Sequence, residues 1–438
     1  GHPVTKGDLA YVGWLAIAVP GAVAGFCDLH SLLGRLPLKK VLTPAIEAAE
    51  EGVPLTFRHQ LEITAELDRI KRYSDTAAAL LVGGKVPSIQ SQTGGGDRLD
   101  TKVLGAVLKR IAKYGKSGFH GGPIAEEIGN YIRSNGGILS ANDVSTYKPR
   151  ILRESPSIYR NHRYVSCYDQ VAYEALNILG QFDVRGLGAD SFGYRHITAE
   201  SLAVAFADNM MHYGDPDFVD SPVNGLSSLD FAKVRRRLIK INKALPRPVK
   251  AGDPWPFETC FSKPKQVDLS TTLARRKGTS CVATADSKGN LASACVSIGS
   301  SYGSLIYIPQ VGIFMNNAMQ NFDPRPDHPS HIAPGKMPIF AAPALVSSAR
   351  GGLSFAASGS GGYRIEPGVL QTFMNHVDHK MAVQKAVDHP RVHSQGGPTY
   401  VDSRIDASVI RRLQKVGHDV CILTEQPGAN HFGRVAAV

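Results

Sequence analysis

The stretch from Gly278 to Ser297, GTSCVATADSKGNLASACVS, is the feature that most constrains how this chain folds. Small and apolar residues alternate with polar ones over residues 279–286 and again over 291–298. The turn-forming residues between these runs include Asp286, Gly289 and Asn290. Two alternating runs joined by such a turn predict a β-hairpin. Its first strand is expected to begin with two hydroxyl-bearing residues, Thr279 and Ser280.

The hairpin also marks a change in character along the chain. Before it, apolar residues recur at three- and four-residue spacings, which predicts helices over residues 42–51, 101–114, 124–135, 172–181 and 198–212. After it, short β runs are expected at 304–316, 353–358, 399–402 and 418–423, with helices at 368–379 and 408–415. The polar, proline-rich residues 246–277 predict an exposed linker.

We therefore expect an α+β protein with a helix-rich portion, residues 1–278, whose linker covers about 246–278. A strand-rich portion, residues 279–438, follows it. The two portions are expected to form one intertwined domain. Both ends of the chain look truncated, because it begins at Gly1 and stops within a strand-like run.

Composition excludes several classes of protein. A chain of 438 residues with 43% hydrophobic and 20% charged residues is globular rather than disordered. The net charge of +11 is scattered and no aromatic residues interleave the basic clusters, so nucleic-acid binding is not expected. No stretch has the apolar length of a membrane span, and six cysteines without paired spacing favour neither a zinc site nor a disulfide framework. The compartment, cytoplasmic or periplasmic, stays open.

A threonine at the start of a strand could carry out amide chemistry. The hydroxyl of Thr279 can attack the carbonyl of Gly278, giving an ester that water opens. The α-amine released in this way has a pKa of about 7.7–8.0 in model compounds, so it can act as the base for the same hydroxyl. Threonine is also common in strands for purely structural reasons. A second element, an oxyanion hole, is therefore needed.

The run Ser358-Gly359-Ser360-Gly361-Gly362 could supply that element. It presents consecutive backbone N–H groups, several without a Cβ, just before a helical stretch. Such groups can stabilise a developing negative charge on oxygen. A tight turn between a strand and a helix is the structural alternative.

Motifs along nearly the whole chain resemble those of the γ-glutamyltransferase (γ-glutamyltranspeptidase) family of N-terminal-nucleophile hydrolases. The matching segments occur in the family's order: 19–25, 96–99, 119–125, 135–140, 213–218, 278–279, 286–290, 316–319, 334–336 and 390–393. The resemblance implies a four-layer αββα sandwich. It also implies self-cleavage between Gly278 and Thr279 into a large and a small subunit.

The resemblance assigns roles to several residues. Thr279 matches the nucleophile, and Gly361 and Gly362 match the glycine pair of the oxyanion hole. Ser297 stands where the family has a threonine whose hydroxyl contacts the nucleophile.

The positions that hold the glutamyl group in the family differ here. Asn321 and Ala318 replace the residues that hold the α-amine, and Gly299 replaces an asparagine that holds the α-carboxylate. Phe340 and Ala341 replace a Ser-Ser pair. A zwitterionic group needs charged partners in a partly buried pocket. These substitutions predict an acyl group that is less polar than glutamyl, or different from it.

We therefore hypothesise an amide hydrolase or acyltransferase that acts on a small-molecule or peptide amide, with water or an amine as acceptor. Glutathione hydrolysis is the family's default activity. A processed but catalytically idle binding or regulatory protein is the alternative. No cofactor, metal, nucleic acid or membrane is expected to take part.

Other reactive residues receive structural interpretations. Cys281 is expected to pack in the core. His389 and His393 have a metal-like spacing, but Pro390 interrupts the helix that would align them. Arg364 is expected to anchor the glycine turn.

Overall fold

The computed structural model describes residues 8–89, 96–167, 169–258, 278–339, 343–349, 354–426 and 429–438. They divide into two compact units. The first contains the described residues of 154–297 and 321–438, and the second those of 5–153 and 298–320. Each unit thus combines segments from both sides of residue 278.

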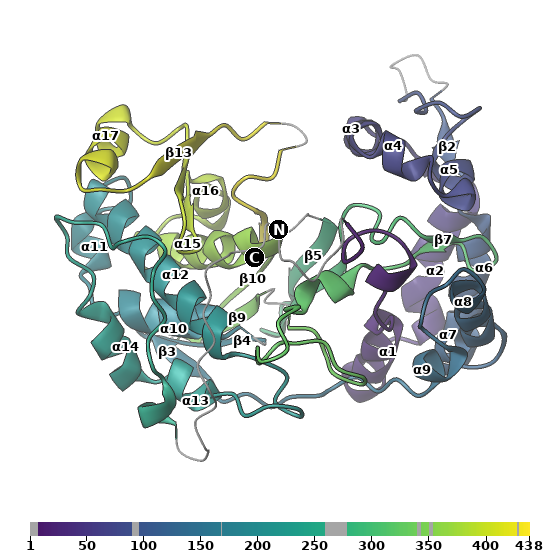
Figure 1. Cartoon of the computed structure of the whole chain (residues 1–438), viewed down its shortest axis with the longest axis horizontal. Coiled ribbons are helices and arrows are strands. Elements are labelled where there is room, and N and C mark those ends of the chain that lie inside the picture. The colour runs from purple at the N-terminus through teal and green to yellow at the C-terminus, as the bar shows by residue number, and fades with distance from the viewer. Residues whose placement is uncertain are drawn as a thin grey trace. The chain divides into compact units, whose positions relative to one another are not determined.

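A five-stranded sheet organises the first unit, in the order β14-β10-β9-β4-β3 (Figure 1). All its neighbouring strands are antiparallel. The hairpin β5–β6 lies against it, with β5 in contact with β10 and β14. A three-stranded sheet, β11-β12-β13, belongs to the same unit. The strands are β3 (Ser157–Tyr159), β4 (His162–Ser166), β5 (Gly278–Ala285), β6 (Leu291–Gly299), β9 (Ala344–Ala349), β10 (Ser354–Ser360), β11 (Val392–Ser394), β12 (Thr399–Asp402), β13 (Val420–Leu423) and β14 (Arg434–Ala437).

Several helices of the first unit begin with a side-chain cap. Ser191 caps the 21-residue helix α12 by accepting a hydrogen bond from the backbone of Tyr194, and Asp169 caps α10 in the same way. Phe373 of α15 packs its ring against Phe355 of β10 at 5.5 Å between centroids. The helices are α10 (Gln170–Leu179), α11 (Val184–Leu187), α12 (Phe192–His212), α13 (Val223–Leu226), α14 (Leu229–Arg236), α15 (Ile365–Val377), α16 (Val383–Asp388) and α17 (Ala407–Lys415).

The second unit is mainly helical. Its apolar core includes Ile111 of α6 and Ile128 of α8, both buried. Its helices are α1 (Ala22–Leu33), α2 (Leu38–Glu51), α3 (Phe57–Ala65), α4 (Leu67–Ile70), α5 (Ser74–Leu80), α6 (Lys102–Tyr114), α7 (Ser117–His120), α8 (Pro123–Ser134) and α9 (Ala141–Ser145). Its strands are β1 (Val53–Pro54), β2 (Arg98–Leu99), β7 (Tyr307–Ile308) and β8 (Ile313–Phe314).

The hairpin and the seven helices predicted from periodicity are confirmed, with boundaries shifted by a few residues. Two expectations were wrong. The run 304–316 forms only the short strands β7 and β8, because the chain turns between them and Gly312 has φ +71°. The first part of the expected linker, residues 246–258, is not an exposed tether. Arg247 pairs with Glu200 at 2.8 Å, and Trp255 is buried. Residues 259–277 lie outside the described ranges.

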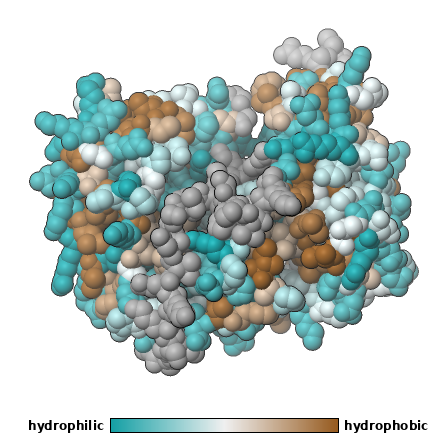
Figure 2. Space-filling view, viewed as in Figure 1, coloured by the Kyte–Doolittle hydropathy of each residue, from teal (hydrophilic) through white to brown (hydrophobic). Residues whose placement is uncertain are grey.

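The face shown in Figure 2 mixes hydrophilic (teal) and apolar (brown) residues. Within the described ranges, the helices lack the combination of length and apolar character needed to cross a bilayer.

Candidate active site

Thr279 and Ser297 face each other across the hairpin β5–β6. Their hydroxyl oxygens are 3.0 Å apart. Ser297 Oγ also donates a hydrogen bond to the carbonyl oxygen of Gly278, again at 3.0 Å. Since a serine hydroxyl has one hydrogen, the bond between the two hydroxyls is donated by Thr279. With this assignment, the hydrogen bonds run from Thr279 through Ser297 to the carbonyl that precedes Thr279.

The hairpin is fixed above β10 by two further side chains of β6. Ser293 Oγ donates to the carbonyl of Ala357 at 2.8 Å, and Cys295 Sγ lies 3.5 Å from the carbonyl of Gly359. In both bonds the partner on β10 is 64 positions later in the chain. Side chains two residues apart share one face of a strand. Ser297 therefore lies on the face of β6 that carries Ser293 and Cys295.

Gly361 and Gly362 turn the chain from β10 into α15. Both have positive φ angles, +142° and +62°, which favour glycine strongly. A Cβ added to Gly361 would lie 3.0 Å from the Cα of Gly433, closer than ordinary contacts allow. These two glycines are therefore required by the local backbone, whatever further role their N–H groups have.

The C-terminal segment packs directly on this turn, which sequence reasoning missed. Asn430 donates to the carbonyl of Ser360 at 3.2 Å, and a Cβ on Gly433 would meet the carbonyl oxygen of Arg364 at 2.5 Å. The only local signal is the glycine within the sequence HFGRV. Because the partners are about 70 residues apart, as for Asn430 and Ser360, no short-range pattern predicts the contact.

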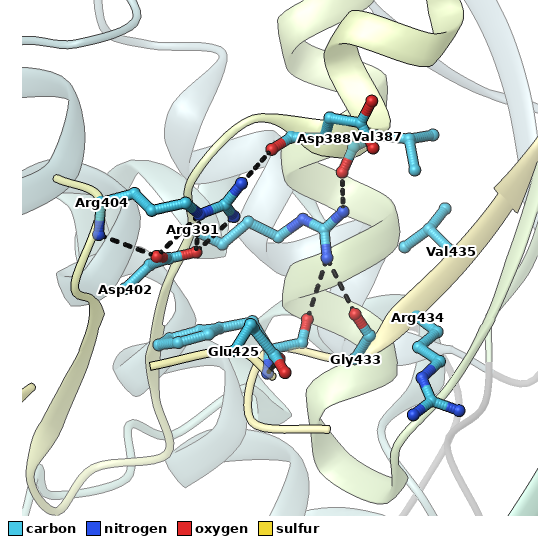
Figure 3. A pocket seen from close by; sticks show the side chains of 10 residues that line it. Val387, Asp388, Arg391, Asp402, Arg404, Glu425, Gly433, Arg434 and Val435 are labelled. Carbon is cyan, nitrogen blue, oxygen red and sulfur yellow. Dashed lines mark hydrogen bonds and ion pairs between the residues drawn. The ribbon is translucent and has the colours of Figure 1, made fainter. Parts of the chain in front are cut away.

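A buried arginine supports the same segment. Arg391 donates to the carbonyls of Gly433 at 2.9 Å and Phe432 at 3.2 Å (Figure 3). Burial lowers the pKa of Arg391 to about 10. The residue lines a pocket of about 240 Å³ together with the ion pair of Asp402 and Arg404. Since this pocket lies beside Gly433, it is next to the backbone that supports the glycine turn.

Gly299, which the resemblance matches to an asparagine, is the last residue of β6, and the final two residues of that strand belong to the second unit. Its φ is +92°, and an added Cβ would lie 1.8 Å from Oδ1 of Asn317 and 2.7 Å from Nε2 of Gln320. The side chains of Asn317 and Gln320 therefore occupy the space that a larger residue at position 299 would need.

The other predicted site residues have varied surroundings. Asn321 is buried at the end of a short 3-10 helix, residues 318–321. Phe340 and Ala341 lie outside the described residues. Arg364 places its guanidinium over the ring of Tyr400, 5.8 Å from its centroid, which fits an anchoring role.

Three side chains of metal-ligand type meet in the first unit: His196 and Glu200 of α12, and His418. His196 Nε2 lies 2.9 Å from the carbonyl of Lys240 and therefore carries the hydrogen, so its Nδ1 accepts from His418 Nε2 at 2.7 Å. Burial lowers the pKa of His418 to about 3, which keeps it neutral. Arg247 already pairs with Glu200. Because these groups satisfy one another, we assign the cluster a structural role.

Known proteins resemble this chain along nearly its whole length. The family model described as gamma-glutamyltranspeptidase matches residues 3–438. The acylase ACY 1 proenzyme of Pseudomonas sp. (strain SE83) is 33% identical over 414 residues, which cover 93% of this chain and 70% of that protein. The glutathione hydrolase proenzyme of Bacillus subtilis (strain 168) is 26% identical over 421 residues, covering 95% and 69%.

Among solved structures, a cephalosporin acylase from Bacillus halodurans superposes with a TM-score of 0.82 and 26% identity. The match covers 97% of this chain and 74% of that chain. The chain therefore shares its mixed helix-and-sheet fold with that enzyme, and it is similar in sequence to both an acylase and a glutathione hydrolase.

Proposed function

Because the chain belongs to the γ-glutamyltranspeptidase family, as its motifs indicated, we propose that it is a self-processing amide hydrolase with Thr279 as nucleophile. The four-layer αββα arrangement and the division into residues 1–278 and 279–438 are part of this proposal. Its relatives are named as proenzymes, which supports maturation of this chain from one precursor.

The observation that carries the proposal is the hydrogen-bond chain from Thr279 through Ser297 to the Gly278 carbonyl. The Thr279 hydroxyl, which would attack, donates to Ser297 Oγ. Ser297 Oγ in turn donates to the carbonyl oxygen of Gly278, on which negative charge would develop. Ser297 can therefore take the proton of Thr279 while it passes its own to the carbonyl oxygen.

Self-cleavage would proceed by a shift of the acyl group from nitrogen to oxygen. A bond forms between Thr279 Oγ1 and the carbonyl carbon of Gly278, and the C–N bond of that peptide breaks as the nitrogen is protonated. Water then hydrolyses the ester, leaving a carboxylate on Gly278 and a free α-amine on Thr279. That amine, with a pKa of about 7.7–8.0 in model compounds, is the base for later turnovers.

The mature enzyme would use the same atoms on a substrate amide. Thr279 Oγ1 attacks the carbonyl carbon, the α-amine takes the proton and gives it to the departing amine, and an acyl-enzyme remains. Water or an amine acceptor releases the acyl group. The backbone N–H groups of Gly361 and Gly362 are proposed to hold the oxyanion. This is supported by their position directly after β10, which the first strand of the hairpin contacts.

For the substrate, we propose an acyl group without the free α-amine of glutamate. Gly299 has no side chain to hold an α-carboxylate, and Asn317 and Gln320 fill the space around it. Asn321, where the family has an acidic residue, offers no negative charge to an amine. The similarity to two acylases favours the same class of substrate.

Two chromogenic amides test the substrate class, because they differ only in the α-amine. Glutaryl p-nitroanilide lacks this group and γ-glutamyl p-nitroanilide carries it. We expect a higher kcat/KM for the glutaryl compound. A higher kcat/KM for the γ-glutamyl compound than for the glutaryl compound would reject the proposed specificity.

Processing is tested by a Thr279→Ala variant beside a Ser280→Ala control. The wild type and the control should each give two fragments on a denaturing gel, with the smaller one beginning at residue 279. Thr279→Ala should remain one chain. A cleaved Thr279→Ala chain would refute the nucleophile. A cleaved wild type that turns over neither anilide nor other acyl amides would favour the idle binding protein.

A further inference from the structure

Two cysteines lie on the hairpin that carries the proposed nucleophile. Cys281 is on β5 and Cys295 on β6, and both are free and half-buried. The proposed reaction uses neither thiol. Their positions relative to each other follow from the register of the hairpin.

Two contacts at opposite ends of the hairpin define that register. At the turn, the backbone N–H of Asp286 donates to the carbonyl of Asn290 at 3.1 Å. At the other end, the hydroxyls of Thr279 and Ser297 meet at 3.0 Å. In an antiparallel pair, each step of two residues along one strand is matched by a step of two back along the other. Both contacts therefore give one register, which places Cys281 directly opposite Cys295.

The same register fixes the kind of pair. Hydrogen-bonded and non-hydrogen-bonded pairs alternate along an antiparallel ladder. Asp286 and Asn290 form a hydrogen-bonded pair, so Cys281 and Cys295, an odd number of steps away, form a non-hydrogen-bonded one. Such pairs have Cα atoms about 4.5 Å apart, and disulfides span Cα distances of about 4.4–6.8 Å. The backbone can therefore accept a disulfide here.

The two thiols also share one environment beneath the hairpin. Cys295 Sγ points to β10, 3.5 Å from the carbonyl of Gly359. Burial raises the pKa of Cys295 to about 12, with the Cys281 thiol as a further contribution. Burial likewise raises the pKa of Cys281. These raised pKa values keep the thiolate fraction small at neutral pH, so we expect oxidation of either thiol to be slow.

We propose that Cys281 and Cys295 are an oxidisable pair that closes into a reversible cross-strand disulfide. The oxidant is a peroxide or a small-molecule disulfide. With a peroxide, one thiolate attacks an oxygen, the O–O bond breaks, and a sulfenic acid and water form. The second thiol attacks that sulfur, so the S–S bond forms and a second water leaves. Two thiols are oxidised and one peroxide is reduced.

The disulfide would affect the hydroxyl pair, and this consequence rests on the proposed function. Cys281 and Cys295 form the next same-face pair along the hairpin from Thr279 and Ser297. Cβ atoms of a strand pair are about 4.5–5.5 Å apart, whereas those of a disulfide are about 3.8 Å apart. A non-hydrogen-bonded pair lies at the short end of this range, so the Cβ atoms approach each other by about 0.7 Å when the disulfide closes. A displacement approaching 1 Å at the reacting groups can cost about a hundredfold in rate.

Peptide mapping tests the disulfide without any assay of activity. The purified protein is treated with dithiothreitol, hydrogen peroxide or 2-hydroxyethyl disulfide, then unfolded in the presence of an alkylating agent and digested with trypsin. Trypsin cuts at Lys288, so Cys281 and Cys295 fall in separate peptides. The oxidised samples should contain these two peptides linked by a bond that dithiothreitol reverses. Full alkylation of both cysteines after oxidation, or links only to exposed Cys167, would overturn the proposal.

A Cys295→Ala variant separates the effect on catalysis. Oxidation should lower the wild-type kcat at least about tenfold, with recovery after reduction, and should leave the variant unchanged. An equal loss in both would reject the coupling to the hydroxyl pair. The map also shows whether the peptide with Cys281 starts at residue 278 or 279, so a failure of processing is distinguished from a failure of disulfide formation.

Discussion

Replacing Ser297 with alanine is the sharpest perturbation of the proposed site. The variant removes the acceptor for the Thr279 proton and the donor to the Gly278 carbonyl, both at 3.0 Å. It leaves Thr279 itself intact. Self-cleavage should therefore slow strongly, although the nucleophile is present.

The magnitude follows from what each bond does. A neutral hydrogen bond contributes about 1 kcal/mol to stability, so the loss of two in a half-buried position should leave the fold intact. Removing one donor to a developing oxyanion typically slows a reaction about 10²- to 10³-fold, or about 2.7–4 kcal/mol. We expect a fall of this size in the rate of processing, with a loss of only a few degrees in Tm.

The assay follows the loss of intact chain on denaturing gels over time. Ser297→Thr keeps the hydroxyl and should process nearly as fast as the wild type. Ser293→Ala is the matched control, because Ser293 is a hydroxyl on the same face of β6 that bonds to Ala357 instead. If Ser297→Ala processed within about threefold of Ser293→Ala, the hydrogen-bond chain would have no part in the reaction.

Three further outcomes are expected. Burial raises the pKa of Asp169 to about 7, so the folded state favours the protonated carboxyl. The free energy of unfolding therefore falls as the pH rises from about 4 to 7, and Asp169→Asn should raise Tm at pH 8 but not at pH 4. Burial lowers the pKa of His418 to about 3, whereas a histidine in the unfolded chain takes up a proton near pH 6.5. The free energy of unfolding therefore falls as the pH drops below about 6.5, and His418→Gln should flatten the acid side of a Tm–pH curve. Gly299→Ala should lower the unfolding free energy by at least about 2 kcal/mol in urea titrations, because its Cβ would lie 1.8 Å from Asn317 Oδ1. An unchanged urea midpoint would contradict this packing.

Local patterns in the sequence were enough for the elements around the site. The alternation on either side of residues 286–290 predicted the hairpin, and apolar spacing predicted α10, α12 and α15. Strands β4 and β9 were not predicted. Their side chains alternate between buried and more exposed positions, but the buried ones include His162, Ser166 and Ser347, so the alternation does not appear as a pattern of hydropathy. Thr279 could be proposed from the sequence because its expected chemistry depends on its place at the start of a strand.

The tertiary structure alone decided which distant residues meet. The contacts of Ser293 and Cys295 with β10, of Asn430 with Ser360, and of Arg247 with Glu200 join residues 47 to 70 positions apart. The space beside Gly299 likewise depends on side chains that fold back over it. Periodicity reports only which face of an element is buried. What that face packs against is set by the free energy of the whole fold, and the register of one strand over another is a property of that packing.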